Sequence, residues 1–342
     1  MVAMSSEDLG QSMGHLHWMF HWPASSSAVT LEALIQSNLA SVRMRAAVAL
    51  SAVRASGWGA SFGEEVPAQT THLVVGKVGA SDLVARAGSW LNEISRTRQL
   101  GGKIYLDYTD HHLGFESEMS GFYRDVLPLI DICICPSESM RFRFREFSNV
   151  VSLTVEDALE VGPIEPKQAI GAVKTALWFG HNSNIGYLRK FLSGEFKPSE
   201  NIRLIVLTNQ AGANEFMRTP QPVISQKVRI ELGPWSLENM VLAGSLSDFG
   251  VLPSDSTDPR KSGVSANRLI TFLALGLPVA ADSVLSYREF GDYFVPLRSS
   301  RLADLIANPL TEREVVLEAQ RFVVPRFTKK RLAKAWRSLF NE

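Results

Sequence analysis

The sequence predicts an α/β protein made of two Rossmann-like, doubly wound lobes. Strand-like and helix-like segments alternate along most of the 342 residues, which is typical of βαβ units and a parallel sheet. The alternation restarts after a loop at 162–166. Each run is about 150 residues long, the size of one domain. Ligands of such sheets bind beyond the carboxyl ends of the strands, so we expect the site in the cleft between the lobes.

The first run begins with the aromatic segment His15–Trp22, which reads as a strand ended by Pro23. A helix is expected over 39–55, where apolar residues recur at helical spacing, and Gly57 ends it. A second helix is expected over 81–97, with Ser81 as its N-cap. The other expected elements are strands at 58–62, 71–75, 103–108 and 131–135 and a helix at 117–127.

The second run contains five expected strands, which lie at 176–179, 201–208, 223–232, 249–253 and 277–281. Helices are expected around Leu188 and Phe191, at 237–243, at 267–275 and from about 311 to the end. The expected domain division is therefore a loose tail at 1–14, lobes at 15–165 and 166–310, and closing helices at 311–342 that pack back across the lobes.

Composition excludes several classes of protein. Lys and Arg together number 35, as do Asp and Glu, so no net charge draws the chain to nucleic acid. Cys133 and Cys135 are two residues apart on one strand, too far for a disulfide and too few for a zinc site. The most apolar segment, Leu269–Ala281, is too short to span a bilayer, and the polar N-terminal segment, without a basic n-region, does not read as a signal peptide. We expect a cytoplasmic protein.

The last 17 residues are strongly basic and amphipathic. Six cations and one acid lie in 326–342, and five apolar residues form one stripe: Leu332, Ala335, Trp336, Leu339 and Phe340. A closing helix whose stripe docks on the body is the favoured interpretation. The alternative is an interfacial helix that makes peripheral contact with anionic lipid at the inner face of the membrane.

A loop–helix junction near the end of the second run suits a phosphate group. The strand ending at Pro253 leads into a polar loop, after which Ser265 and Ala266 open a helix. A helix N-terminus offers unpaired amides and partial positive charge. Lys261 and Arg268 add cationic donors on either side. This arrangement would stabilise a departing diphosphate; the structural alternative is an ordinary loop and helix with surface cations.

The same segment resembles the donor-binding lobe of GT-B-fold glycosyltransferases, particularly family 4. There a basic loop precedes a helix that runs through Ala-x-Gly-x-Pro-Val into a strand, as Ala274–Val279 does here. The run Lys261–Arg268, with Asn267 inside it, and the segment Ser286–Phe290 extend the match. The family usually has a glutamate on this helix to hold the nucleotide ribose. Thr271 occupies that position here and offers a single hydroxyl instead.

The resemblance also implies donor contacts elsewhere. Gly180 would let the backbone approach the sugar diphosphate, and His181 and Asn182 would reach sugar hydroxyls. Trp235 lies in the segment that resembles the loop covering the nucleobase. The structural alternatives are a plain turn at Gly180 and a core position for Trp235.

In the first lobe, Asp110 and His111 follow a strand that faces the expected cleft, and either could deprotonate or orient an acceptor hydroxyl. Alternatively, Asp110 caps a helix and His111 lies on the surface. Arg43 and Arg45 lie near the start of the first long helix, where they would contact an anionic acceptor or remain solvated. Adjacent histidines do not have metal-ligand spacing on a helix, and GT-B enzymes generally need no metal, so we expect neither metal nor cofactor.

The sequence lacks the phosphate-loop, serine-hydrolase, zinc-protease and dinucleotide-binding motifs, which counts against those classes of enzyme. The resemblance carried by Lys261–Phe290 implies a glycosyltransferase that moves a sugar from a nucleotide-diphosphate sugar, bound by the second lobe, to an acceptor on the first. The acceptor class, whether glycan, lipid, protein or small molecule, stays open. Two rivals remain. One is a non-catalytic GT-B scaffold that binds a nucleotide sugar or a protein, and the other is a nucleotide-sugar epimerase.

Overall fold

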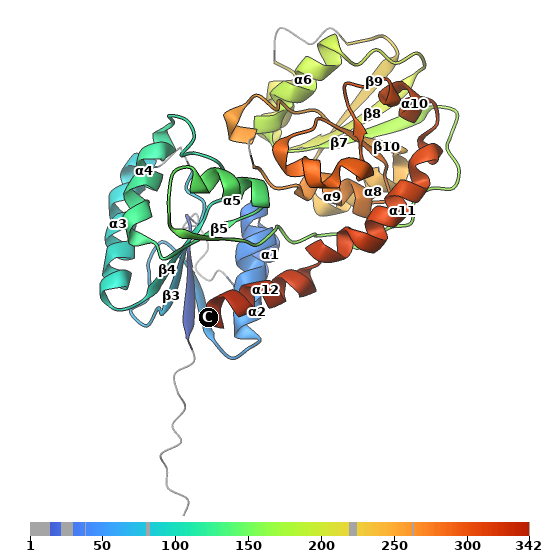
Figure 1. Ribbon diagram of the computed structural model, residues 1–342. Helices are drawn as coiled ribbons and strands as arrows, with labels where there is room; N and C mark the ends of the chain where they lie inside the picture. Colours follow the sequence, from blue (N-terminus) through green and yellow to red (C-terminus); the bar gives the residue numbers. More distant parts are fainter. Residues whose placement is uncertain are drawn as a thin grey trace, which may run out of the picture. The chain divides into compact units, whose positions relative to one another are not determined.

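The computed structural model describes residues 14–21, 30–37, 39–79, 83–218, 224–261 and 263–341. The chain forms two compact units (Figure 1). The N-terminal unit contains the described residues of Met1–Pro136, Arg141–Val155 and Leu332–Glu342, and the C-terminal unit those of Ser137–Met140 and Glu156–Arg331. Most of the predicted tail, and the predicted cap Ser81, lie outside the described residues.

The N-terminal unit is built on a parallel sheet with the strand order β2-β1-β3-β4-β5-β6. Its strands are β1 (His15–Met19), β2 (Gly59–Gly63), β3 (His72–Val75), β4 (Lys103–Asp107), β5 (Ile132–Cys135) and β6 (Val151–Thr154). The five predicted strands are confirmed, although β1 stops at Met19 and releases His21 from the sheet. β6 was not predicted.

The helices of this unit are α1 (Leu31–Ile35), α2 (Ala47–Arg54), α3 (Leu83–Gln99) and α4 (Glu118–Val126). α5 (Glu138–Arg145) is shared between the two units. The helix predicted over 39–55 begins with a π-helical turn, Val42–Ala46, which runs straight into α2. This wider turn carries both Arg43 and Arg45, and both side chains are buried.

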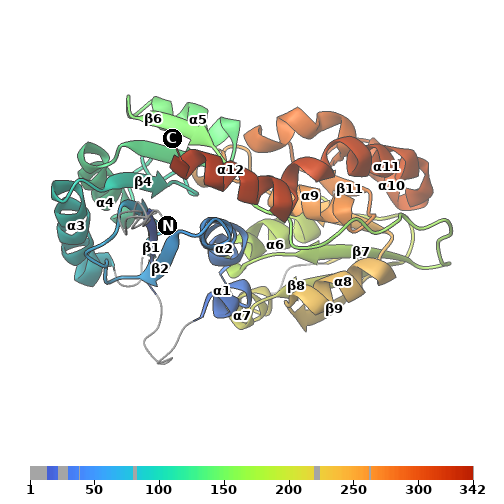
Figure 2. The ribbon, with the colours of Figure 1, turned by 90° about the horizontal axis from the view of Figure 1, so that it is seen from below.

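The C-terminal unit is a second parallel sheet, with the order β12-β11-β10-β7-β8-β9. Its strands are β7 (Lys174–Phe179), β8 (Ile202–Thr208), β9 (Val228–Pro234), β10 (Phe249–Leu252), β11 (Val279–Ala281) and β12 (Val295–Pro296). Read from β9, this is the order 3-2-1-4-5-6 of dinucleotide-binding folds. Figure 2 shows β7, β8 and β9 beside α8.

Helices cover both faces of this sheet. They are α6 (Ile185–Gly194), α7 (Gln210–Phe216), α8 (Leu237–Leu246), α9 (Asn267–Ala274), α10 (Arg301–Ala307) and α11 (Arg313–Phe322), with 3-10 turns at Asn182–Asn184, Pro259–Lys261, Leu285–Tyr293 and Pro309–Glu312. Two separate apolar clusters fill the unit, one centred on α9 and the other on α6. The sheet is thus buried on both faces, as a parallel sheet requires.

The C-terminal segment is helical as predicted, but it is broken. A 3-10 turn at Val324–Phe327 separates α11 from α12 (Lys329–Asn341), because Pro325 cannot continue a helix. Four of the five stripe residues of α12 are buried, and Ala335 is half-buried. In the N-terminal unit, Trp336 meets Trp18 with ring centroids 5.3 Å apart, and Phe340 meets Tyr105 at 5.2 Å. The apolar side of α12 therefore packs on the N-terminal unit, as the favoured interpretation predicted.

Two predictions about individual segments can be checked directly. Cys133 and Cys135 are buried, unbridged thiols on one side of β5, with their Sγ atoms 3.8 Å apart. In the part of the chain that the structure describes, no helix is long and apolar enough to cross a bilayer.

Candidate functional site

The candidate site lies at the carboxyl edge of the C-terminal sheet, where β7 and β10 are neighbours. From β7 the chain builds the sheet first towards β8 and β9, and later towards β10, β11 and β12. The loops that follow β7 and β10 therefore leave the sheet in opposite directions. Such a switch point opens a crevice that binds ligands in doubly wound folds.

Gly180 follows β7 directly and is held by its backbone. Its amide donates to the carbonyl of Leu207 at 3.0 Å, and the Thr208 hydroxyl donates to its carbonyl at 2.8 Å. A Cβ at position 180 would lie 3.0 Å from the Trp178 ring and 3.3 Å from Nη1 of Arg268. Gly180 thus keeps room for the Arg268 guanidinium at the end of β7.

Arg268 comes from the first turn of α9, and its Nη1 is the unusual atom of the site. That nitrogen is buried and has no hydrogen-bond partner among the described residues. Tyr287 lies beside the guanidinium: burial raises the pKa of Tyr287, and the charge of Arg268 and a hydrogen bond from its side chain oppose that rise. A buried cationic donor without an acceptor is costly, so this nitrogen favours an anionic ligand.

Lys261 also contacts the segment that follows β7. Its Nζ donates to Oδ1 of Asn184 at 2.7 Å and lies 5.2 Å from the centre of the Tyr187 ring. The structure therefore brings Lys261 to the segment that begins at Gly180, the segment that Arg268 also approaches. The two predicted cations converge on one loop.

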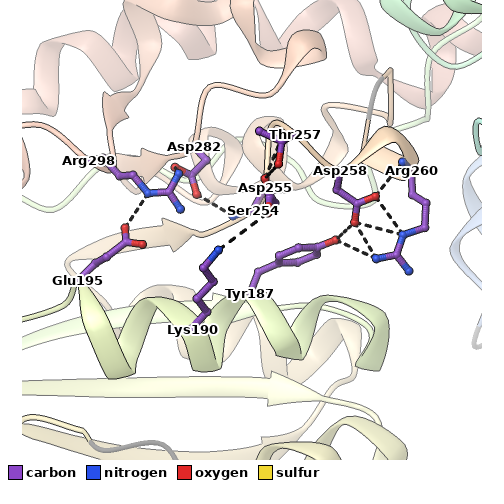
Figure 3. A network of polar contacts seen from close by, with 10 residues as sticks. All are labelled: Tyr187, Lys190, Glu195, Ser254, Asp255, Thr257, Asp258, Arg260, Asp282 and Arg298. Carbon is purple, nitrogen blue, oxygen red and sulfur yellow. Dashed lines mark hydrogen bonds and ion pairs between the residues drawn. The ribbon is translucent and has the colours of Figure 1, made fainter.

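A polar network holds the loop after β10 against α6 (Figure 3). The Tyr187 hydroxyl donates to Asp258, which also accepts from Arg260. The hydrogen bonds from Arg260 lower the pKa of Asp258 to about 2, and burial together with Asp258 raises the pKa of Tyr187 to about 12. No sequence motif points to this network, because Tyr187 and Asp258 are 71 residues apart.

A second part of the network anchors the start of the loop. The buried carboxylate of Asp282, which follows β11, accepts from the Ser254 amide at 2.8 Å and pairs with Arg298 at 3.0 Å (Figure 3). Burial raises the pKa of Asp282, and the Ser254 amide and the charge of Arg298 oppose that rise. The end of β10 is therefore fixed to the end of β11.

The remaining predicted donor residues surround this edge with different roles. Ser265 accepts from the Asn267 amide at 3.2 Å, next to the buried Ala266, and so shapes the start of α9. His181 is exposed, and Asn182 accepts from Asn209 at 3.4 Å. Trp235 is half-buried and packs against the apolar core.

Thr271 is the predicted donor residue that is least available to a ligand. Its side chain is buried, and its hydroxyl donates to the Asn267 carbonyl at 2.7 Å within α9. The hydroxyl proton is therefore already committed to the helix backbone. The two lone pairs of one oxygen remain as acceptors, which is less than the two oxygens of a carboxylate would offer a ribose diol.

The predicted acceptor-side residues of the N-terminal unit are more enclosed than we expected. Asp110 forms an ion pair with Lys77. His111 is only 3% exposed, its Nδ1 faces the Tyr108 hydroxyl at 3.2 Å, and burial lowers its pKa. It is therefore not the surface residue that the alternative interpretation required. Among the described residues, no group of three or more acidic, His or Cys side chains could hold a metal ion.

Arg45 is inaccessible to an acceptor. Its guanidinium is fully buried and pairs with Asp107 at 2.6 Å, donates to the Val155 carbonyl at 2.6 Å and lies over the Trp336 ring. The predicted acceptor contact is wrong for this side chain because every face of it meets protein. Arg43 is 7% exposed and donates to the Ser37 carbonyl at 2.6 Å.

Comparison with known proteins supports the architecture. No protein-family profile matches the sequence, and no curated protein matches it either. Solved structures do match over nearly the whole chain. Anabaena HepE in complex with UDP and glucose is 9% identical, with a TM-score of 0.59 over 96% of this chain and 99% of that chain.

Two further glycosyltransferases match comparably well. T4 phage BGT in complex with its UDP-glucose substrate is 12% identical, with a TM-score of 0.56 over 96% of this chain and 98% of that chain. The lipopolysaccharide outer core galactosyltransferase WaaB in its apo form is 9% identical, with a TM-score of 0.55 over 96% and 99%. At such low identity the likeness shows the fold: this chain has the two-unit GT-B fold of glycosyltransferases, as its sequence predicted.

Proposed function

We propose that this protein is a glycosyltransferase that takes a sugar from a nucleotide-diphosphate sugar. The donor is held at the carboxyl edge of the C-terminal sheet, and the acceptor is held by the N-terminal unit. The observation that carries the proposal is Nη1 of Arg268, a buried cationic donor beside Gly180 for which the described residues provide no acceptor. A diphosphate oxygen would satisfy it.

The chemistry of the edge fits a diphosphate leaving group. Arg268 and Lys261 bring two positive charges to the loop after β7, and the first amides of α9 add partial positive charge. Charge that builds up on the diphosphate as the glycosidic bond breaks would meet preorganised donors. Neighbours that share the fold, HepE and T4 phage BGT, were crystallised with UDP or UDP-glucose. The proposal includes no cofactor and no metal.

Binding of nucleoside diphosphates tests the donor site. We expect UDP, or another member of a panel of UDP, GDP, ADP and CDP, to raise the melting temperature of the wild type, because a ligand at about a hundred times its Kd stabilises by about 2.7 kcal/mol. The double variant K261A/R268A should bind the same nucleotide at least about a hundredfold more weakly by calorimetry, since charge-assisted hydrogen bonds contribute about 1.5–3 kcal/mol each.

The matched control is Arg229→Ala, which removes an exposed arginine from the start of β9, at the opposite edge of the sheet. Its affinity should equal that of the wild type. Undiminished binding by K261A/R268A, or no binding of any member of the panel by the wild type, rejects the donor site.

Product analysis separates the proposed transferase from its rivals. Release of free nucleoside diphosphate from the nucleotide sugar supports transfer, whereas a scaffold releases none. An epimerase converts the donor sugar without any acceptor. We retain the family 4 assignment as part of the proposal, on the Ala274–Val279 motif. Any peripheral contact of α12 with anionic lipid would have to be electrostatic, because four of the five residues of its apolar stripe are buried.

A further inference from the structure

The outermost strand of the C-terminal sheet, β9, pairs with β8 alone among the described strands. The carbonyl of Lys227 accepts a hydrogen bond from β8 at 2.8 Å, and the amide of Trp235 donates to β8 at 2.8 Å. Because the direction of the backbone groups alternates along a strand, every second residue between these two also bonds to β8. The backbone groups of Val228, Ile230 and Leu232 therefore point outward, away from the sheet.

The outward side of β9 offers hydrogen-bonding groups to another strand. The Val228 amide donates to the Ser225 carbonyl at 2.9 Å within a turn. Among the described residues, none bonds to the outward amide or carbonyl of Ile230 or of Leu232. An edge with such groups is a template for pairing with a further strand.

The side chains of β9 alternate between apolar and charged: Val228, Arg229, Ile230, Glu231 and Leu232. The two charged residues lie on one face of the sheet, and the three apolar residues lie on the other. Arg229 is 82% exposed, and its Nε lies 3.8 Å from Oε1 of Glu231. Read from the opposite end, the same order of apolar and charged residues returns with the two charges exchanged. The edge is therefore complementary to a second copy of itself.

The charged face of β9 holds more cations than carboxylates. Arg203 of β8 is the register partner of Arg229, which places two guanidinium groups side by side. Both pair with the same carboxylate, Glu231, and Arg203 is the closer of the two. The hydrogen bond from Arg203 lowers the pKa of Glu231, so this carboxylate is charged at neutral pH. A second carboxylate beside Arg229 would balance the group.

We propose that two copies of this chain associate through β9, antiparallel about a two-fold axis at Ile230. Ile230 of each copy exchanges two backbone hydrogen bonds with Ile230 of the other, and the Leu232 amide donates to the Val228 carbonyl of the second copy. Arg229 then faces Glu231 of the second copy in a pair without backbone bonds, where side chains lie closest. The two six-stranded sheets become continuous across the axis. The inference does not rest on the proposed function.

Charge selects this register over the alternatives. Pairing must keep the outward residues Val228, Ile230 and Leu232 opposite one another, so other antiparallel registers differ by two residues. A shift of two residues sets Arg229 against Arg229, or Glu231 against Glu231, and like charges directly opposite each other are unfavourable. Charged side chains commonly keep edge strands apart. Here their signs are opposite at the positions that the axis brings together.

The apolar face of β9 adds a smaller contribution. Leu232 is 37% exposed, and in the pair it packs on Val228 of the second copy. Five residues per strand make a small interface, so the association is weak and depends on concentration.

Sedimentation of the full chain over a range of concentrations tests the dimer without any nucleotide. The wild type should change from one to two chains per particle as its concentration rises through the micromolar range. Arg229→Glu should weaken the dimer at least about tenfold, because two pairs of opposite charge become two pairs of like charge, and Glu231→Arg should do the same. An equal mixture of R229E and E231R should associate again, since opposite charges then face each other. Arg321→Glu, an exposed control on α11, should dimerise like the wild type.

Cross-linking tests the register. Facing Cβ atoms in an antiparallel pair lie about 4.5–5.5 Å apart, so a mixture of Arg229→Cys and Glu231→Cys should form a disulfide between copies under mild oxidation. The mixed dimer keeps its second charge pair intact. R229C alone should cross-link far more slowly, because the axis does not bring position 229 opposite itself.

Several outcomes would overturn the proposal. They are a wild type that stays monomeric at every concentration, a dimer that R229E leaves unchanged, a mixture of R229E and E231R that does not associate, and self-linking of R229C as fast as in the mixture. UDP affinity gives an independent readout, because R229E should bind UDP like the wild type. A wild type that dimerises without binding nucleotide would reject the donor site alone.

Discussion

In the N-terminal unit, charged and titratable side chains are buried against one another, whereas the C-terminal unit places its cations at the edge of the sheet. Arg45, Asp107 and His17 are at most 1% exposed in the first unit. In the second unit, the buried carboxylates Asp248 and Asp282 each accept a backbone amide at 2.8 Å. Two six-stranded parallel sheets thus differ in where their charged side chains lie: some are buried inside the first unit, and cations lie at the edge of the second.

This difference in the placement of charge predicts which charged residues matter for stability and which matter for ligand binding. A buried ion pair adds little net stability, but the removal of one partner is costly. A cation with an unsatisfied donor at a switch point is instead available to a ligand. We therefore expect charge substitutions inside the N-terminal unit to unfold it, and those at the edge of the C-terminal unit to change affinity.

The largest expected effect is a loss of stability when Arg45 is replaced. Arg45→Met leaves Asp107 as a buried charge without its partner, so the free energy of unfolding should fall by about 3–5 kcal/mol. Urea unfolding followed by circular dichroism measures this change, and hydrogen exchange should locate the opening in the N-terminal unit. Arg54→Met, an exposed substitution on α2, should change stability by less than about 0.5 kcal/mol.

The double variant R45M/D107L sharpens this test. It should recover most of the loss, because an apolar pair of similar volume can replace a buried ion pair. If R45M instead keeps full stability and loses turnover of UDP-glucose, then Arg45 does contact the acceptor as the sequence predicted, and the structural role fails.

Acidic pH should lower the stability of the N-terminal unit in particular. Burial is the main cause that lowers the pKa of His17 and of His72 to about 4. The unfolded chain binds these protons near the usual histidine pKa of about 6.5. Stability is therefore complete above about pH 6.5 and falls as the pH drops towards 4, by about 2–3 kcal/mol for His17 alone.

Urea unfolding at pH 7.5 and pH 4.5 checks this dependence. The fall should be smaller in His17→Gln than in the wild type, and His181→Gln, which removes an exposed histidine, should leave it unchanged. Equal pH dependence in all three proteins would show that His17 does not carry the effect.

Local pattern predicted most of the fold, because the alternation of strands and helices reflects periodicity along the chain. Elements whose burial depends on distant partners were missed. α5 was not predicted because arginines alternate with apolar residues along it. β6 was not predicted because it is a short strand whose first residue, Val151, is exposed. The aromatic run from His15 predicted a strand up to Trp22. That strand ends earlier, at Met19, and His21 leaves the sheet to meet Glu64.

In the candidate site, too, contacts between residues far apart in the sequence could not be predicted. Lys261 and Arg268 could be named because a loop followed by a helix start is visible in sequence. Their convergence on the loop after Gly180 depends on the order of β7 and β10 in the sheet, which local pattern does not contain. Likewise, no local signal joins Tyr187 to Asp258 or His21 to Glu64, since each pair forms only after the sheets assemble.

The smallest expected effect concerns Thr271, the position where the resemblance to family 4 led us to expect a ribose-binding glutamate. Thr271→Val removes a hydroxyl that is already bonded to the Asn267 carbonyl and keeps the size of the side chain. UDP affinity should change by less than about twofold and stability by about 1 kcal/mol or less, the net contribution of one neutral hydrogen bond. A tenfold loss of affinity would mean that the hydroxyl turns from the helix to the nucleotide when UDP binds. The edge of the C-terminal unit would then rearrange around its ligand instead of presenting preorganised donors, and the contrast between the two units would weaken.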